Sequence, residues 1–509
     1  MQRMDAASHT EDDARYRALC SRDARFDGQW FVGVTSTGIY CRPVCRVRTP
    51  KQDNCRFFDH AAQAEQAGFR PCLRCRPELA PQQRHWSRED AAGILLQQAM
   101  HWLDNPQHWG TTAGEAPTLE RLAARLGVSG RHLRRVFESR LGVSPLQYLL
   151  TRKQLCAKQL LTDTNLPITE VAQASGFGSL RRFNAAFRHQ YGLAPTQLRQ
   201  RTGSNAPVPA CRPVRLTWRP PFDAAAMLRF MADRQLDGVE QVAPAQGIYA
   251  RTVRLQQAGR TYNGWFSAHF EAHAQRLQLT LSDGLQPALP QLLRRVRALF
   301  DLDVDPQPIN ALLHDDFPGG DGLRVPGTTD GFELAVRAVL GQQVRVGGAR
   351  TLVCRLVEAV GQPLATGQPG LRFLFPEPET VACLEPAVLG SLGIVRQRQT
   401  ALLALARAVA DGRLSLDLGD DPEHTVQALC ALPGIGPWTA QYIALRALRW
   451  PDAWPTGDVA LTRQLGLPEH RSAQAQRTAR ALAQTWQPWR GYAVVRAWAG
   501  THRSQASTT

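Results

Sequence analysis

The stretch from residue 432 to residue 458 constrains the fold more than any other part of this 509-residue chain. It opens with Leu-Pro-Gly-Ile-Gly-Pro-Trp, in which Gly434 and Gly436 permit positive φ and a close backbone approach. Pro437 suits the first turn of a helix, so the pattern predicts a tight hairpin between two helices. Bare amides at such a helix start can bind a phosphate without reading a base. A generic turn at a helix start is the alternative interpretation.

Asp458 follows the hairpin in the Gly/Pro-rich segment 455–458. Taken alone, this residue is typical of the N-cap of a helix that begins at Val459. Taken together with the hairpin, the segment resembles the helix-hairpin-helix DNA glycosylases, which end in a Gly/Pro-rich loop and an aspartate, and most closely the AlkA type of DNA-3-methyladenine glycosylase II. The resemblance extends through residues 341–343, 442–446 and 489–493.

This resemblance implies an enzyme that flips a base out of the duplex, because a base inside the stack cannot be attacked. Asp458 would stabilise the oxocarbenium-like sugar as an alkylated base leaves. Aromatic faces attract cationic bases through the ring quadrupole, with core packing as the alternative role. The implied pocket residues are Trp438, Tyr442 and Trp498. The resemblance implies that Val325, in the loop 323–327, is the wedge residue that fills the gap, with Leu323 as the alternative.

Two absences narrow the expected reaction. Trp438 stands where strand-cleaving relatives carry a nucleophilic lysine, so the resemblance implies a monofunctional glycosylase. No cysteine follows Cys430, so we expect no iron–sulfur cluster of the four-cysteine kind found in some relatives. Gly457 stands where AlkA-type chains often have an acidic residue.

The charge of the chain points to the same class of partner. A formal net charge of +16 indicates a polyanion, and we expect double-stranded DNA. A membrane surface is the competing polyanion. However, no run of about 18 apolar residues occurs, and the polar residues 1–13 do not form a signal peptide. We therefore expect a monomeric, cytoplasmic and nucleoid-associated protein with no membrane contact.

Two closely spaced cysteine pairs lie in the N-terminal region. Cys41 and Cys45 form a C-x3-C pair, and Cys72 and Cys75 form a C-x2-C pair. Four thiolates at this spacing predict one tetrahedral Zn²⁺ site. The chain has eleven cysteines, an odd number, so we do not expect a disulfide scaffold. Chance proximity of the cysteines and a purely structural zinc site are the alternatives.

The sequence around these pairs, residues 38–45 and 67–77, resembles the zinc domain of Ada-type adaptive-response proteins. In that family the first cysteine of the first pair irreversibly takes a methyl group from a DNA methylphosphotriester, which implies Cys41 as the acceptor. A zinc-bound thiolate stays deprotonated and nucleophilic. Methylation removes one unit of negative charge from the site, so DNA affinity should rise. Candidate phosphate contacts are Arg42, Arg46 and Arg70, with solvated surface charge as the alternative.

Two helix-turn-helix units are expected in residues 86–202. Each combines an amphipathic helix, a turn and a basic second helix, and the second helices begin near Ser129 and Ser179. Each unit could lay one helix in a major groove. Two copies at this spacing resemble the AraC-type DNA-binding domain, including Gly176-Phe177 and residues 193–195. The candidate DNA contacts are Arg131, Arg134, Arg135, Ser179, Arg181 and Arg182.

Beyond a Gly/Ser/Pro-rich linker at 201–212, strand-like alternation at 214–218, 247–253 and 277–281 predicts an α+β unit. Helices are expected at 224–234 and 290–300. The unit resembles the N-terminal domain of AlkA-type glycosylases, and we expect a packing role for it.

We therefore expect a multidomain, mainly α protein with α+β parts. The predicted units are a zinc methyl-acceptor domain (1–80), an all-α double helix-turn-helix (86–202), an α+β front domain (210–320) and an all-α glycosylase domain (321–500). Together they imply a damage sensor that activates transcription, in contact with RNA polymerase, fused to a glycosylase that releases 3-methyladenine-like bases in base excision repair. The alternative is a regulator whose glycosylase half only binds DNA.

Overall fold

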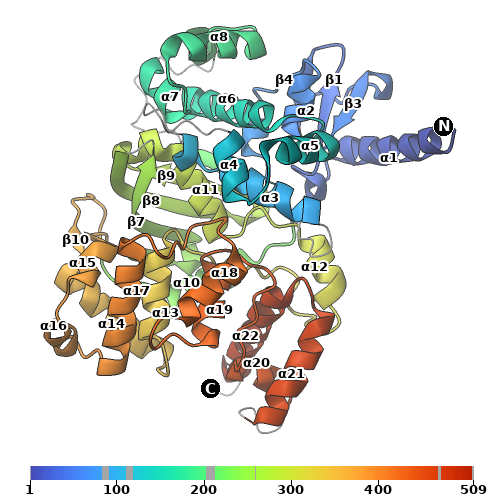
Figure 1. The fold of residues 1–509 in the computed structure, drawn as a ribbon. Coiled ribbons are helices and arrows are strands. Elements are labelled where there is room, and N and C mark those ends of the chain that lie inside the picture. The colour runs from blue at the N-terminus through green and yellow to red at the C-terminus, as the bar shows by residue number, and fades with distance from the viewer. Residues whose placement is uncertain are drawn as a thin grey trace.

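The computed structural model describes residues 2–82, 91–109, 119–164, 166–201, 213–257, 260–467 and 472–506. Figure 1 shows the N-terminal cysteine-rich part and the helices α3–α9 at one end, a five-stranded sheet in the middle and a helical bundle at the other end. The linker predicted at 201–212 lies outside the described residues except for Arg201. No helix of the described part is long and apolar enough to span a membrane.

The first part of the chain forms a small four-stranded sheet beside two helices. Its elements are α1 (Gln2–Ser21), β1 (Phe31–Val34), β2 (Ile39–Cys41), β3 (Cys55–Phe58), α2 (Ala61–Gln66) and β4 (Arg70–Pro71). The strand order is β3-β1-β2-β4, and β2 runs parallel to β4 with Tyr40 opposite Pro71. This register brings the end of β2, at Cys41, next to the residue that follows β4, Cys72. The two cysteine pairs therefore meet although they are far apart in sequence.

Seven helices follow: α3 (Ala91–Leu103), α4 (Leu119–Arg125), α5 (Gly130–Leu141), α6 (Pro145–Asp163), α7 (Ile168–Ala174), α8 (Leu180–Tyr191) and α9 (Pro195–Arg201). Ser129 and Ser179 cap the two basic helices, α5 and α8, and each hydroxyl accepts a hydrogen bond from the backbone N–H three residues later. Gly142 and Gly192 end these helices in the left-handed conformation. The two predicted helix-turn-helix units are confirmed, and the long helix α6 joins them.

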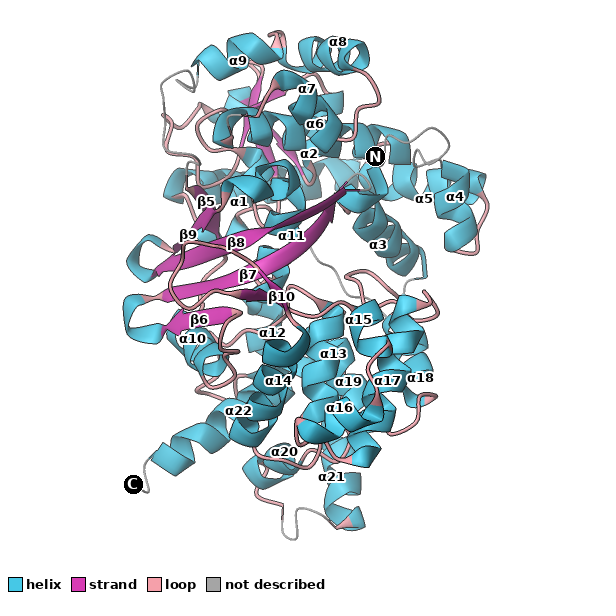
Figure 2. Ribbon diagram, turned by 90° about the vertical axis from the view of Figure 1, so that its left-hand side faces the viewer, coloured by secondary structure: helices cyan, strands magenta, loops and turns pink. Residues whose placement is uncertain are grey.

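The middle layer is an antiparallel sheet in the order β5-β9-β8-β7-β6 (Figure 2). The strands are β5 (Val214–Thr217), β6 (Glu240–Ala243), β7 (Ile248–Gln257), β8 (Arg260–Glu271) and β9 (Arg276–Leu281), with the helices α10 (Ala224–Ala232), α11 (Leu289–Leu299) and α12 (Pro306–Leu313). The three predicted strands are present. Two others, β6 and β8, were missed because polar side chains interrupt their apolar alternation.

The remaining chain is a helical bundle with two hydrophobic cores. Its helices are α13 (Gly331–Leu340), α14 (Val346–Val360), α15 (Pro378–Ala382), α16 (Pro386–Ser391), α17 (Arg396–Ala410), α18 (Pro422–Cys430), α19 (Pro437–Arg446), α20 (Val459–Gln464), α21 (Ala473–Thr485) and α22 (Arg490–Ala506). Two short strands, β10 (Gln362–Pro363) and β11 (Phe373–Leu374), pair after α14.

The predicted hairpin joins α18 to α19. Gly434 has φ +78° there, and a Cβ at this position would lie 2.9 Å from the Cβ of Ala401 on α17. Both the conformation and the close approach therefore require glycine. Gly436 is the N-cap of α19 and Pro437 is its first residue, as the sequence predicts.

Buried charged side chains join the cysteine-rich part to its neighbours. Lys158 on α6 is 0% exposed, donates to the carbonyl oxygen of Cys72 at 3.2 Å and pairs with Glu78. Arg219, which follows β5, donates to the carbonyl oxygens of Asp27 at 2.9 Å and Asp303 at 2.5 Å. Such buried polar contacts fix the orientation of the parts, because each donor removed would leave an acceptor without a partner.

We predict that Lys158→Met loosens the contact between α6 and the cysteine-rich part by about 3 kcal/mol, because it removes one partner of a buried ion pair. Glu78 would keep Arg76, at 3.0 Å, which limits the loss. Hydrogen exchange of the α6 backbone amides measures the change. Lys51→Met, at an exposed lysine, is the control. Equal protection in the two variants would contradict the prediction.

Candidate functional site

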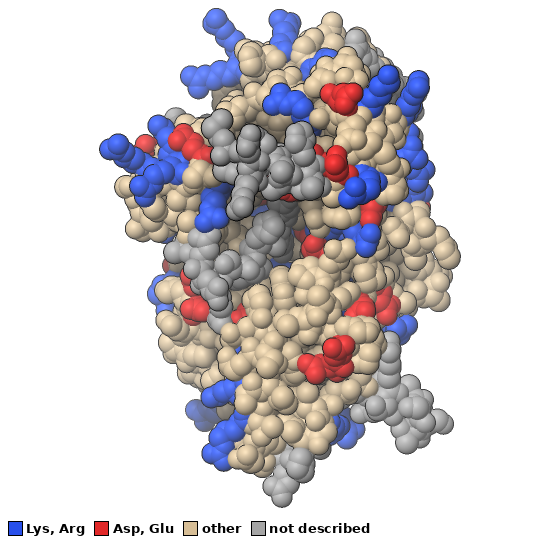
Figure 3. Space-filling view, turned by 90° about the vertical axis from the view of Figure 1, so that its right-hand side faces the viewer, with Lys and Arg blue, Asp and Glu red and all other residues tan. Residues whose placement is uncertain are grey.

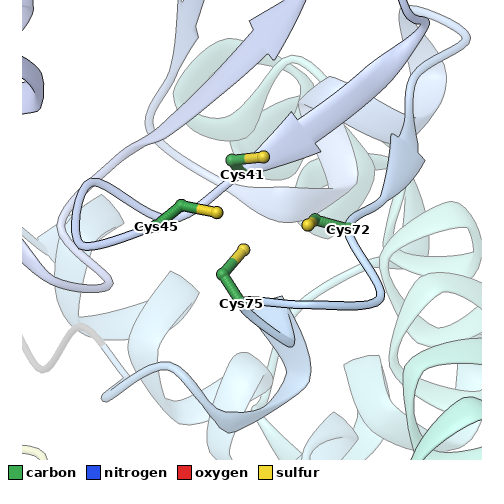
Figure 4. Close-up of side chains that lie close together, drawn as sticks. All are labelled: Cys41, Cys45, Cys72 and Cys75. Atoms are coloured by element: carbon green, nitrogen blue, oxygen red, sulfur yellow. The ribbon is translucent and has the colours of Figure 1, made fainter. Parts of the chain in front are cut away.

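The first candidate site is the group of four cysteines. Cys41 and Cys45 come from β2 and the turn after it, and Cys72 and Cys75 come from the loop after β4. Figure 4 shows the four side chains pointing toward one another, and their sulfur atoms all lie within 4.8 Å. A zinc ion with bonds of about 2.3 Å to four sulfurs separates those sulfurs by about 3.8 Å. The donor set therefore fits a tetrahedral zinc ion.

Backbone N–H groups around the cysteines favour the thiolate form of their sulfur atoms. The N–H of Arg42 donates to the sulfur of Cys75 at 3.3 Å, and the N–H of Arg74 donates to the sulfur of Cys72 at 3.4 Å. Hydrogen bonds to the charged form of a group favour that form. Cys41 itself is buried, but together with Cys45 and Cys72 it borders a largely apolar cavity of about 250 Å³.

Arg42 is buried and paired inside the protein, which contradicts the prediction that it contacts phosphate. The residue is 5% exposed, its guanidinium pairs with Asp27, and it donates to the hydroxyl of Thr217 at 2.7 Å. Its charge is therefore satisfied inside the protein. Arg46 and Arg70 are exposed, and Arg70 donates to the carbonyl oxygen of Tyr191 at 3.1 Å.

The candidate DNA contacts of the helix-turn-helix part lie at the surface. On α5 these are Arg131, Arg134 and Arg135, and on α8 they are Arg181 and Arg182, with Ser179 at the exposed start of the helix. In Figure 3, Lys and Arg side chains gather on the upper half of the molecule, which carries these helices. Two exposed basic helices of the same pattern suit contact with a polyanion.

The second candidate site is centred on Asp458. Its Oδ1 accepts from the N–H of Leu461 at 2.9 Å and so caps α20. Its Oδ2 accepts from the indole N–H groups of Trp438 at 3.1 Å and Trp498 at 3.2 Å. The side chain caps a helix and also faces two aromatic residues, so the two interpretations of this aspartate are compatible. Although the residue is 6% exposed, its carboxylate has three donors.

The aromatic residues named from the sequence come together beside this carboxylate. The rings of Trp438 and Tyr442 are stacked, with centroids 5.2 Å apart and an interplanar angle of 14°. Trp498 lies 5.9 Å from Tyr442 at an angle of 47°. All three line a cavity of about 320 Å³ between α10, α13, α14, α19 and α22. Two of them, Trp438 and Trp498, also donate to Asp458, so the cavity lies next to that carboxylate.

The cavity also contains arginines that sequence reasoning missed. Arg446 donates to the hydroxyl oxygen of Tyr442 at 2.5 Å, and Arg234 lies against the ring of Phe230, 3.8 Å from its centroid. Burial raises the pKa of Tyr442, but the positive charges of Arg446 and Arg234 outweigh it and hold that pKa below its usual value. The sequence feature that could have identified Arg446 is its position four residues after Tyr442, which places the two side chains on the same helix face.

Val325 does not fit the predicted wedge role. It is 2% exposed, packs in a hydrophobic core, and its carbonyl oxygen accepts from Arg449 at 2.8 Å. A side chain held in this way cannot enter a DNA duplex without disrupting the core. Val325 therefore contributes packing.

The loop between α13 and α14 is exposed instead. Val344 and Val346 are 38% and 41% exposed and line the cavity, and Gln343 has φ +55°, a conformation that is rare for a residue with a side chain. Gln342 ties the loop to the hairpin by donating to the carbonyl oxygen of Gly434 at 2.9 Å and to Thr439 at 3.1 Å. The sequence analysis did not identify this exposed loop as part of the site, because single exposed residues between two apolar helices form no recognisable pattern.

Four family models match the chain in order. They are described as the metal binding domain of Ada (residues 14–78), a helix-turn-helix domain (122–201), the AlkA N-terminal domain (213–330) and an HhH-GPD superfamily base excision DNA repair protein (336–491). The chain thus carries a DNA glycosylase domain behind a regulatory half.

Relatives match both halves. A Mycobacterium tuberculosis protein named probable bifunctional transcriptional activator/DNA repair enzyme AlkA is 37% identical over 96% of this chain and 96% of its own length. The Escherichia coli DNA-3-methyladenine glycosylase 2 is 35% identical over 56% of this chain and 95% of its own. The Escherichia coli bifunctional transcriptional activator/DNA repair enzyme Ada is 38% identical over 28% of this chain and 36% of its own. The chain therefore belongs to the family of bifunctional transcriptional activators and DNA repair enzymes in which an Ada-type regulatory half precedes an AlkA-type glycosylase half.

Proposed function

We propose that this protein excises alkylated bases from DNA and also senses alkylation of the DNA backbone to activate transcription. The observation that carries the first activity is the carboxylate of Asp458, which two indole N–H groups hold beside an aromatic cavity. In this proposal, the domain of residues 1–80 accepts the methyl group and the domain of residues 86–202 recognises the promoter. Residues 210–320 form the front domain, and residues 321–500 form the glycosylase domain.

In the glycosylase reaction, the damaged nucleotide leaves the duplex and its base enters the cavity between Trp438, Tyr442 and Trp498. The N-glycosidic bond then breaks, its electron pair goes to the base, and positive charge develops on the sugar. The Asp458 carboxylate stabilises that charge until water adds to the sugar. The helix start at residue 438 offers an indole rather than an amine, so no Schiff base forms there.

Two backbone features hold the substrate DNA. The amides at the start of α19, after Gly434 and Gly436, grip a phosphate of the damaged strand. The exposed loop around Gln343 fills the gap that the flipped nucleotide leaves, in place of the buried Val325. Gln342 donates hydrogen bonds to both the hairpin and α19, so the phosphate-binding amides and the loop that fills the gap form one surface.

In the sensing reaction, the Cys41 thiolate attacks the methyl carbon of a neutral methylphosphotriester. A sulfur–carbon bond forms, the carbon–oxygen bond breaks, and the phosphate leaves as an ordinary diester anion. Cys41, Cys45, Cys72 and Cys75 would hold a zinc ion, which would keep their thiolates deprotonated at neutral pH. The lost negative charge lowers repulsion from DNA, so the basic helices α5 and α8 bind more tightly. Arg46 and Arg70 add phosphate contacts, and the bound monomer recruits RNA polymerase.

We predict that Asp458→Asn lowers single-turnover release of 3-methyladenine at least about a hundredfold, because the sugar cation loses its counter-charge. Asparagine keeps the helix cap, so the fold and DNA affinity should stay within about threefold of the parent. Asp315→Asn, at an exposed aspartate, is the control.

Two outcomes would contradict this proposal in different ways. If Asp458→Asn retained activity, the carboxylate would have no catalytic role. If the parent protein bound methylated DNA but released no base, the glycosylase half would be a DNA-binding module of a regulator.

We predict that incubation with methylated DNA adds one methyl group per chain to the parent protein, on Cys41. Intact-mass analysis and peptide mapping measure it. Affinity for promoter DNA should then rise about fivefold or more, since one unit of negative charge near phosphate is lost. Cys41→Ala should remain unmethylated, and Cys20→Ser, at an exposed cysteine outside the cluster, should behave as the parent. Bound zinc without methyl uptake would make the cluster purely structural.

A further inference from the structure

The loop between α13 and α14, residues 341–345, lies at the rim of the aromatic cavity. Gly341 and Val344 line that cavity, whereas Gln343, which lies between them, is not part of its wall. The side chain of Gln342 connects the loop to the hairpin and to α19 by two hydrogen bonds. The loop therefore stands between the proposed base cavity and the proposed phosphate-binding hairpin, where a flipped nucleotide would leave its gap in the duplex.

The backbone of this loop holds Gln343 in a conformation that a residue with a side chain rarely adopts. Its φ is +55°, in the left-handed region that favours glycine. The residue before it is fixed on two sides, because Gln342 donates to the carbonyl oxygen of Gly434 at 2.9 Å and accepts from Arg398 at 2.6 Å. Such strain persists only where the surrounding structure imposes it, and it is concentrated at sites that bind or react. The fold thus holds Gln343 at a defined place on the rim.

The side chain of Gln343 has hydrogen-bonding capacity to spare. It is exposed and, within the part of the chain that the structure describes, its carboxamide makes no hydrogen bond. The neighbouring Val344 and Val346 are also partly exposed, but they are apolar and line the cavity. A carboxamide carries one acceptor oxygen and two donor hydrogens. Gln343 therefore offers these groups outward, to a partner outside the protein.

Flipping a nucleotide creates the matching need in the DNA. The base that was paired with it stays in the stack, so its Watson–Crick edge faces the gap. An apolar side chain in the gap would leave the donors and acceptors of that edge without partners, which costs free energy. The Watson–Crick edge of every base has a donor next to an acceptor. A carboxamide can bond to such a pair, as it does to the adjacent donor and acceptor of adenine in the major groove.

We propose that Gln343 enters the gap left by the flipped nucleotide and recognises the unpaired partner base through its carboxamide. This inference rests on the proposed base flipping and names the side chain that reads the opposite strand. The carboxamide can rotate to match either order of donor and acceptor, so the contact serves any of the four bases. A partner without hydrogen-bonding groups loses it. Gln343 therefore recognises a polar edge and not one particular base.

The test compares binding to two duplexes that carry a tetrahydrofuran abasic analogue, so that no base is flipped or released. The opposite base is thymine in one duplex and difluorotoluene in the other, which has the shape of thymine without its strong hydrogen-bonding groups. We predict that the parent binds the thymine duplex about tenfold more tightly, because two hydrogen bonds to a desolvated edge are lost with difluorotoluene. Gln343→Leu, of similar size but apolar, should show no preference for thymine.

Two further variants serve as controls. Gln368→Leu, at an exposed glutamine in the loop between β10 and β11, is the matched control and should keep the parental ratio. Gln343→Gly separates recognition from folding, because φ +55° suits glycine. Its thermal unfolding midpoint should not fall below that of the parent, while the preference for thymine should be lost.

Equal binding of the two duplexes by the parent, or the parental ratio in Gln343→Leu, would overturn the inference, whether or not the protein releases 3-methyladenine. A parent protein that prefers thymine about tenfold but releases no 3-methyladenine would overturn the proposed glycosylase function and leave the partner-base contact in place. The binding ratio and the base-release assay therefore separate the failure of one proposal from the failure of the other.

Discussion

The carboxylate of Asp458 is the interaction on which the glycosylase half depends. A buried anion is costly unless hydrogen bonds satisfy it, and here one backbone N–H and two indole N–H groups do so. The same three bonds fix the start of α20 and the two aromatic side chains, Trp438 and Trp498. The charge that the proposed reaction needs and the positions of two aromatic side chains of the cavity therefore have a common cause, which is the placement of one aspartate at a helix N-cap.

The two halves of the chain are joined by buried charges rather than by a broad apolar contact alone. Arg42, beside the proposed methyl acceptor, spans from Asp27 to Thr217 on the first strand of the front domain. Lys158 on α6 donates to the carbonyl oxygen of the cysteine ligand Cys72. The cysteine cluster is thus held from both sides, by the glycosylase half and by the helix that links the two helix-turn-helix units.

Much of the fold and of the two candidate sites was predictable from patterns formed by residues close together in the sequence. Cysteine spacing, serine caps before basic helices and the Leu-Pro-Gly-Ile-Gly hairpin each depend on nearby residues, and each is found where the sequence indicates. The errors concern partners distant in sequence. Arg42 looked like a surface charge because Thr217, which it reaches, lies 175 residues away. Val325 looked like a loop tip because most of the core that buries it comes from residues after 440, which join Val304, Ile309, Leu313 and Phe317 there. Arg234 was missed for the same reason, because the aromatic residues that line the cavity with it lie far along the chain.

The proposed glycosylase site holds charged side chains of both signs. In the proposed mechanism the Asp458 carboxylate supplies negative charge beside the sugar cation, while Arg234 and Arg446 lie in the wall of the neighbouring cavity. Neither set requires reorganisation during the reaction, because the helix cap, the indoles and backbone carbonyls already hold them.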